Sequence, residues 1–196
     1  MIGAIVLAAG LSTRMGQPKM LMEWGGKKVI EQVVDVLLAA ELKEIVVVTG
    51  ELKLEMEKVL ENRDAKIVFN PQYANGEMTG SLQVGLNEIS AEVGAAMVVL
   101  GDQPFIKQDT VNSVINAYKL GKAAIIMPSV NNRRGHPWII QRKLWQEVLD
   151  IKPPDTMREF FTKNQDQIGY VVIDDPSIIQ DVDTPEDYQQ FHPGSA

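Results

Sequence analysis

Short apolar runs bounded by turn residues recur along the chain. They occupy residues 5–7, 45–48, 67–69, 97–100, 125–127, 138–140 and 170–173. A strand that is buried on both faces reads as a continuous apolar run, whereas a half-exposed strand alternates with polar residues. The runs therefore predict a mostly parallel sheet that is covered on both sides.

Between several of these runs, apolar residues recur at helical spacing. Three sets are each predicted to share one helix face: Val29, Val33, Val34, Leu37 and Leu38; Leu54, Met56, Val59 and Leu60; Val111, Val114, Ile115 and Tyr118. Thr156 is predicted to cap a further helix after the proline-rich break at 152–155. This alternation predicts an α/β fold with three layers, a Rossmann-like sheet with helices on both faces. Ligands of such sheets bind outside the carboxyl ends of the strands.

The length of 196 residues and the hydrophobic content of 45% predict one domain over residues 1–196. No apolar run approaches the roughly 20 residues that a membrane-spanning helix needs. The apolar start has no basic leader before it and is interpreted as a first strand rather than a signal peptide. We therefore expect a cytoplasmic protein without membrane contact.

The charge and the absence of cysteine narrow the chemistry. With no cysteine, the chain has no disulfide, thiolate metal site or cysteine nucleophile, so a metal ion would be held by oxygen or histidine. The chain has 26 acidic and 19 basic residues, a net charge of −7, which disfavours a nucleic-acid partner. An anionic ligand would need a local positive centre.

A glycine-rich turn with basic residues follows the first strand. Gly10, Arg14, Gly16 and Lys19 precede a helix that is predicted to begin near Lys28. Glycines let backbone N–H groups approach an anion closely, and Arg and Lys add positive charge. The spacing matches neither G-x-x-x-x-G-K-[ST] nor G-x-G-x-x-G. From the residues alone, the turn is either a tight connection or an anion-binding site.

Two aspartates also follow apolar or extended segments. Asp102 comes directly after the strand at 97–100, and Asp183 belongs to the stretch D-V-D-T-P at 181–185. An aspartate in a turn commonly caps a helix or bonds the backbone. A pair of carboxylates can instead hold Mg²⁺, which fills its octahedral shell with water and phosphate oxygens.

Several stretches together resemble the nucleotidyltransferases of the MobA-like group, which join a nucleoside monophosphate to molybdopterin. The first is L-A-A-G-x-S-x-R-M-G-x-x-K at 7–19; the others are N-P-Q-Y-A-N-G at 70–76, G-D-Q-P at 101–104, G-H-P at 135–137 and D-V-D-T-P at 181–185. They occur in order over most of the chain. Ala9 favours the cytidylyl-transferring branch, because guanylyl-transferring members more often have Ala-Gly-Gly there.

The resemblance implies a Rossmann-like nucleotidyltransferase fold and a Mg²⁺-dependent transfer of CMP from CTP to the phosphate of molybdopterin, with release of pyrophosphate. A molybdenum hydroxylase apoenzyme is an implied later partner. The resemblance also implies that Arg14 and Lys19 are catalytic residues that act on the triphosphate. It implies that Asp102 and Asp183 bind Mg²⁺, and that Asp102 is a catalytic residue as well. His136 is implied to face the acceptor. The implied nucleotide contacts are Leu7, Ala8, Ala9, Gly10, Gly80 and Ser81.

Several alternatives stay open. Thr79 or Ser81 could simply cap a helix, and the roles of Asp181, Arg133 and Arg134 are not assigned. The rival functions are a GTP-using or sugar-phosphate nucleotidyltransferase, and a non-catalytic carrier that delivers the cofactor to a xanthine dehydrogenase-like enzyme.

Overall fold

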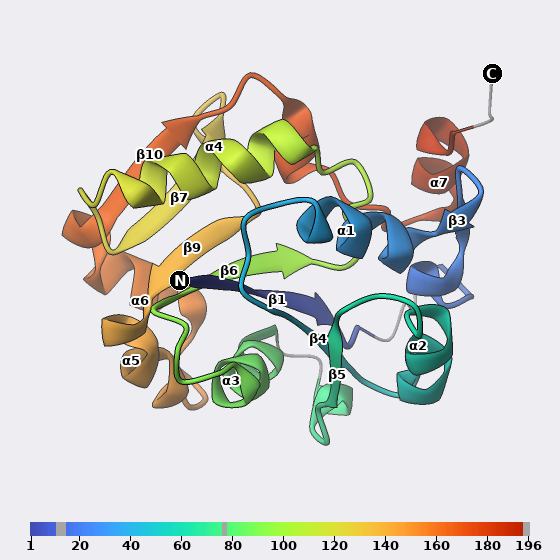
Figure 1. Cartoon of the computed structure of the whole chain (residues 1–196), viewed down its shortest axis with the longest axis horizontal. Coiled ribbons are helices and arrows are strands. Elements are labelled where there is room, and N and C mark those ends of the chain that lie inside the picture. The colour runs from blue at the N-terminus through green and yellow to red at the C-terminus, as the bar shows by residue number, and fades with distance from the viewer. Residues whose placement is uncertain (11–14, 76–77, 194–196) are drawn as a thin grey trace.

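One twisted sheet forms the centre of the protein (Figure 1). The computed structural model describes residues 1–10, 15–75 and 78–193. Within these ranges the sheet has eight strands in the order β10-β7-β9-β6-β1-β4-β5, with β8 paired to β7. The strands are β1 (Ile2–Ala8), β4 (Ile45–Thr49), β5 (Lys66–Phe69), β6 (Ala95–Leu100), β7 (Ile125–Val130), β8 (Arg133–Arg134), β9 (Trp138–Gln141) and β10 (Ile168–Val172).

Helices cover both faces of this sheet (Figure 1). They are α1 (Val29–Leu38), α2 (Lys53–Val59), α3 (Met78–Glu88), α4 (Gln108–Lys119), α5 (Trp145–Leu149), α6 (Met157–Lys163) and α7 (Pro185–Phe191). Short 3₁₀ turns are η1 (Lys19–Leu21), η2 (Tyr73–Asn75), η3 (Arg142–Leu144), η4 (Gln165–Gln167) and η5 (Pro176–Ile179), and β2 (Glu23–Trp24) pairs with β3 (Lys27–Lys28) in a small hairpin. None of the helices in the described ranges is long and apolar enough to span a membrane.

Strand β1 shows why the fold has three layers, with helices on each face of the sheet. Ala4 and Val6 pack in the apolar cluster that contains α1 and α4, whereas Ile5 and Leu7 pack in the cluster that contains α3, α5 and α6. Successive side chains of a strand point to opposite faces, so a strand apolar at every position needs cover on both. Burying one such Ile or Leu contributes about 1.5–3 kcal/mol. The predicted α/β fold is confirmed.

The pairing is parallel for β1 with β4 and β6, for β4 with β5 and for β10 with β7. β9 runs antiparallel between β6 and β7, and β8 runs antiparallel to β7. The predicted mostly parallel sheet is therefore confirmed, and the antiparallel direction of β9 is a finding of the structure that the sequence pattern did not address. Because β1 and β6 are parallel neighbours, the loops that follow them meet at one edge.

The predicted helices at 29–38 and in 111–118 are present as α1 and α4, and Thr156 caps α6 by accepting a hydrogen bond from the backbone N–H of Glu159. Two assignments to a buried face were wrong. Leu38, the last residue of α1, is 40% exposed, although Val34 and Leu37 are buried. Leu54 in α2 is 76% exposed, although Met56 and Leu60 are buried. Helix α2 has only seven residues, so its apolar stripe is too short to include all four predicted positions.

The C-terminal helix α7 is fixed by aromatic packing. Trp24 contacts Phe105 and Tyr188 edge to face, with ring centroids 5.1 and 6.1 Å apart, and Phe191 packs on Phe105 at 5.3 Å. The Tyr188 hydroxyl donates to the backbone oxygen of Glu23 at 2.6 Å. This packing brings the segment just before α7 against the edge where β1 and β6 end.

Candidate active site

Three charged side chains from distant parts of the sequence meet at the carboxyl edge of the sheet. The ammonium group of Lys19 donates to Oδ2 of Asp102 at 2.5 Å and to Oδ1 of Asp183 at 2.8 Å. Lys19 begins η1 after the turn that follows β1, Asp102 follows β6, and Asp183 precedes α7. Lys19 is only 8% exposed. The structure therefore brings together three of the predicted site residues.

The backbone holds the two acidic segments side by side. The N–H of Val182 donates to the backbone oxygen of Asp102 at 3.2 Å, and the Val182 side chain is fully buried. Thr184 caps α7, and Asp187 accepts from the backbone N–H groups of Asp183 and Thr184. The position of Asp183 is thus set by a backbone bridge on one side and a helix cap on the other.

The charges of this site compensate one another. Burial alone would lower the pKa of Lys19, but the charge of Asp102 and hydrogen bonds to both aspartates outweigh it and raise the pKa above its ordinary value. Lys19 is therefore protonated at neutral pH. The sequence placed Lys19 on the triphosphate, whereas in this ligand-free structure its ammonium group lies between the two predicted metal ligands.

Asp181 differs from Asp183 although the two lie only two residues apart. Its Oδ1 accepts a hydrogen bond from Nε2 of Gln103 at 2.6 Å. Burial, together with the negative charges of Asp102 and Asp183, raises the pKa of Asp181. Asp181 thus bonds to Gln103, whereas Lys19 bonds to Asp102 and Asp183.

The donor set fits a small, hard cation such as Mg²⁺. The Oδ2 atom of Asp102 and the Oδ1 atom of Asp183 converge on one positively charged nitrogen, which shows that the pair can stabilise a cation at a shared point. In the described ranges no group of three or more His, Cys, Asp or Glu side chains could enclose a metal ion. Two carboxylates would therefore leave coordination positions for water and phosphate oxygens, the usual arrangement for Mg²⁺ at a nucleotide.

The predicted nucleotide turn lies beside this charged cluster. Leu7, Ala8 and Ala9 are buried and Gly10 is exposed, with no atom within 4 Å of the place where a side chain would begin. The backbone N–H of Gly101 donates to the oxygen of Leu7 at 3.0 Å, which joins the turns after β1 and β6. Arg14 lies outside the described residues, so its predicted role stays a prediction.

The start of α3 corrects one alternative. The helix begins at Met78, so Thr79 and Ser81 lie within it and cannot be its cap. Ser81 is buried, and its hydroxyl accepts a hydrogen bond from Nδ2 of Asn70 at 3.0 Å. A Cβ added at Gly80 would have no atom within 4 Å of it, which leaves the backbone approachable there. Nucleotide contact by Gly80 and Ser81 stays a prediction.

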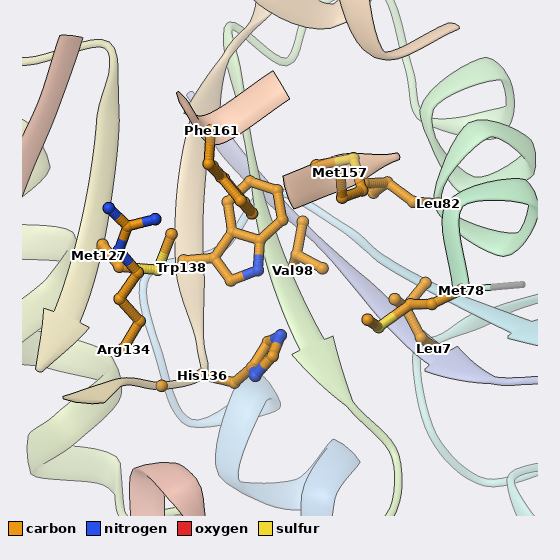
Figure 2. Close-up of a pocket in the computed structure, with 11 residues that line it drawn as sticks. Leu7, Met78, Leu82, Val98, Met127, Arg134, His136, Trp138, Met157 and Phe161 are labelled. Atoms are coloured by element: carbon orange, nitrogen blue, oxygen red, sulfur yellow. The ribbon is translucent and has the colours of Figure 1, made fainter. Parts of the chain in front are cut away.

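An apolar pocket opens next to the turn after β1 (Figure 2). It encloses about 510 Å³, part of it open to solvent. Trp138 and Phe161, in edge-to-face contact at 5.1 Å, lie on one side, and the His136 ring points into the space between them and Met78. The residues that line the pocket are Leu7, Met78, Leu82, Val98, Met127, Arg134, Gly135, His136, Trp138, Met157 and Phe161.

His136 is the predicted acceptor contact, and its environment keeps it uncharged. Its backbone N–H donates to the oxygen of Ile178 at 2.8 Å, which holds the turn against η5. Burial lowers the pKa of the imidazole from 6.5 to about 4, because an imidazolium ion would lose its hydration. At neutral pH the ring can therefore both donate and accept one hydrogen bond in the pocket.

The lowered pKa of His136 predicts an acid-sensitive fold. The unfolded chain takes up this proton below about pH 6.5 and the folded chain only below about pH 4, so the free energy of unfolding should fall as the pH drops through this window. We expect a loss of about 1–3 kcal/mol from this group. Urea unfolding at about pH 7 and about pH 4.5 should show a smaller loss in His136→Gln than in the unsubstituted protein. Equal losses in both would contradict this environment for His136.

Gly135 permits the close approach of η5 to the histidine turn. A methyl group on Gly135 would lie 2.3 Å from the backbone oxygen of Ile178 and 2.8 Å from its Cβ. Gly135→Ala should therefore lower the free energy of unfolding by about 1–3 kcal/mol, as overpacking commonly does.

Gly94→Ala is the matched control in urea unfolding, because its methyl group would meet only the oxygen of Met1 at an ordinary 3.8 Å. If Gly135→Ala is as stable as Gly94→Ala, the close contact with η5 is wrong.

Some residues of the site were missed by sequence reasoning. Asn70 is 2% exposed and links β5 to α3 through Ser81, and Gln103 is equally buried and binds Asp181. Oε1 of Gln103 has no hydrogen-bond partner among the described residues. Both residues lie in motifs that were quoted for their resemblance, and the available signal for Asn70 was its place directly after β5. Arg134 lines the apolar pocket together with His136, and its guanidinium group donates to the Tyr170 hydroxyl at 2.5 Å.

A Rossmann-like sheet with a lysine and two carboxylates at its carboxyl edge is the arrangement expected of a nucleotidyltransferase. The model of the MobA-like NTP transferase domain matches residues 4–168. The chain belongs to this family.

Comparisons with individual proteins agree with this class. The chain is 28% identical over 188 residues to the molybdenum cofactor cytidylyltransferase of Escherichia coli (strain K12), covering 95% of this chain and 93% of that protein. It is 28% identical over 200 residues to a probable molybdenum cofactor guanylyltransferase of Natranaerobius thermophilus, covering 96% and 94%. The crystal structure of Rv0371c from Mycobacterium tuberculosis H37Rv aligns with a TM-score of 0.85 at 23% identity, covering 96% of this chain and 95% of that one.

Proposed function

We propose that this nucleotidyltransferase transfers CMP from CTP to the phosphate of molybdopterin and releases pyrophosphate. The observation that carries the proposal is the place of Leu7. Leu7 lines the apolar pocket and is the last residue but one of β1, just before the turn that begins at Ala9 and Gly10. A nucleotide at the turn and an acceptor in the pocket would therefore be neighbours, as a direct transfer between them requires.

The nucleotide side supports a triphosphate ligand. The N–H groups of the turn offer partial positive charge, and a divalent cation on Asp102 and Asp183, together with Lys19, would outweigh the negative charge of the two carboxylates. The choice of CTP rests on Ala9, which resembles the cytidylyl-transferring members, and is supported by the similarity to the cytidylyltransferase of Escherichia coli. The similarity to a guanylyltransferase makes GTP the alternative nucleotide to be tested.

The acceptor side favours a flat, largely apolar ring system over a sugar with many hydroxyl groups. Most of the pocket wall is aliphatic or aromatic, and among the described residues its polar side chains are Arg134 and a neutral His136. The hydroxyl groups of a sugar phosphate would lose hydrogen bonds to water there without finding enough partners. A flat pterin ring can bury its faces against Trp138 and the methionine side chains, while its polar edge meets His136 or Arg134. This favours molybdopterin over the sugar-phosphate alternative.

The reaction needs no general base from the chain. The second pKa of a phosphate monoester lies near 6, so the attacking oxygen is ionised at neutral pH. That oxygen bonds to the α-phosphorus as the bond to the bridging oxygen breaks and pyrophosphate leaves. The chain would align the two substrates and neutralise charge, with Lys19 and the predicted Arg14 on the phosphates.

Asp102 and Asp183 would hold Mg²⁺ when it is bound. The ion would supply positive charge to the phosphate oxygens and help to orient them. Beside this pair, Nε2 of Gln103 donates a hydrogen bond to Oδ1 of Asp181 at 2.6 Å.

The test is a comparison of CTP, GTP and ATP with purified protein, molybdopterin and Mg²⁺, with pyrophosphate release as the readout. Fastest release with CTP is the expected result. Preference for GTP would replace the nucleotide but keep the reaction. Release with a sugar phosphate and none with molybdopterin would overturn the acceptor. Tight cofactor binding without turnover would favour the alternative of a non-catalytic carrier.

A further inference from the structure

The ammonium group of Lys19 lies at the point where a metal ion on Asp102 and Asp183 would bind. Its nitrogen is 2.5 Å from Oδ2 of Asp102 and 2.8 Å from Oδ1 of Asp183. The lysine is 8% exposed, and the side chains of Asp102 and Asp183 are 18% and 32% exposed, so this is a partly buried contact. The two carboxylates that contact it belong to segments joined by the Val182 bridge.

Lys19 in this position and a divalent cation are difficult to accommodate together. A Mg²⁺ ion binds carboxylate oxygens at about 2.1 Å, so an ion on the same two oxygen atoms would lie within about 5 Å of the ammonium nitrogen. A divalent and a monovalent positive charge repel strongly at that distance in a site with little water. Each oxygen would also have to serve two cations at once.

We propose that Lys19 and the divalent cation exchange places at the Asp102–Asp183 pair during the reaction cycle. In the free protein Lys19 offsets one of the two negative charges of the pair. When a nucleoside triphosphate and the cation bind, the lysine side chain leaves the pair for the phosphates and the cation takes the carboxylates. This inference rests on the proposed nucleotidyl transfer, and it adds a coupling between cation and nucleotide.

The exchange needs little change in the backbone. The oxygen of Lys19 accepts from the N–H of Met22 at 3.2 Å as part of η1, and the neighbouring Met20 is buried. The backbone at Lys19 is therefore anchored, while its four-carbon side chain can rotate. The same anchored lysine can contact the carboxylates or a ligand above the turn.

The charges account for the direction of the coupling. Two carboxylates carry −2, and with the Lys19 ammonium the cluster carries −1. With a divalent cation on the pair the cluster is neutral, and the released ammonium adds +1 for the triphosphate. Each ligand therefore improves the site for the other, and by linkage the two factors must be equal.

The first test measures Mn²⁺ binding without nucleotide, and the concentration of free Mn²⁺ is determined by electron paramagnetic resonance. Lys19→Met should bind Mn²⁺ more tightly than the unsubstituted protein, by a factor in the range of about 5–150 that is typical of coupled sites. Lys143→Met is the control, because it removes the same charge from an exposed position in η3 and should leave Mn²⁺ affinity unchanged. The neighbouring Arg142 donates its backbone N–H to the oxygen of Gly94, just before β6 begins. Equal affinities of Lys19→Met and the unsubstituted protein would overturn the exchange.

The second test uses the unsubstituted protein, in case Lys19→Met does not fold. Trace acetylation of Lys19 by acetic anhydride is measured by mass spectrometry, with Lys143 as the internal reference. The rate at Lys19 should be low in the free protein, rise at least about fivefold with saturating Mn²⁺, and fall again when CTP is added. A rate at Lys19 that Mn²⁺ does not change would contradict the exchange.

These tests separate the inference from the proposed function. Both are carried out without molybdopterin and do not depend on turnover. If Mn²⁺ releases Lys19 but no nucleotide gives pyrophosphate, the exchange stands and the proposed function fails. If CTP supports turnover while Mn²⁺ affinity ignores Lys19, the exchange fails and the proposed function stands.

Discussion

Replacing Asp102 by asparagine is expected to lower the rate of pyrophosphate release by about 100- to 1,000-fold, the range found when one electrostatic contact to a reacting group is removed. Asparagine keeps the size of the side chain but removes its negative charge. The pair with Asp183 would then carry one charge instead of two, which weakens both the hold on Lys19 and the hold on Mg²⁺.

The measurement is steady-state pyrophosphate release at saturating CTP and Mg²⁺. Asp109→Asn is the matched control, because Asp109 is an exposed aspartate in the first turn of α4. That variant should keep a normal rate. Thermal unfolding of both variants shows whether the fold is intact. A folded Asp102→Asn with a rate close to normal would remove Asp102 from the active site.

Replacing Lys19 by alanine is expected to lower kcat/KM for CTP by about 100-fold or more, because a cation that acts on the triphosphate is lost. Most of the loss should be a higher KM, since Lys19 would contact the triphosphate before and during transfer. Part should be a lower kcat, because charge moves to the leaving pyrophosphate as the reaction proceeds.

The measurement is the initial rate over a range of CTP concentrations, with Lys143→Ala as the control. Loss of the ammonium also leaves Asp102 and Asp183 close together without their shared cation, so the variant should gain more thermal stability from Mg²⁺ than the unsubstituted protein does. An unchanged rate at low CTP would count against a contact between Lys19 and the phosphates.

The fold could be predicted largely because its central strands are apolar at every position. β1, β4 and β6 are covered on both faces by helices, and this cover was predicted from the sequence pattern. The antiparallel direction of β9 could not be predicted, because a short apolar run has the same pattern in either direction. The exposure of Leu54 depends on how far α2 extends over the edge of the sheet, which is a tertiary property.

The residues of the charged cluster were predicted from the sequence, but their contacts with one another were predicted only in part. Lys19 and Asp102 are separated by 83 positions, and Lys19 and Asp183 by 164, yet each follows or precedes an element that ends at the same edge. Topology therefore indicated that they would lie close together. Their pairing was not predicted, because it depends on the ligand-free charge balance. The apolar pocket was missed because its walls come from strands β1, β6, β7 and β9 and from helices α3 and α6.

The most direct test of the central claim is a crystal structure of the protein with CTP and Mg²⁺. We expect the triphosphate above the turn that follows β1, the cation on Asp102 and Asp183, and the Lys19 ammonium on phosphate oxygens. CTP bound elsewhere, or a cation that contacts neither aspartate, would contradict it.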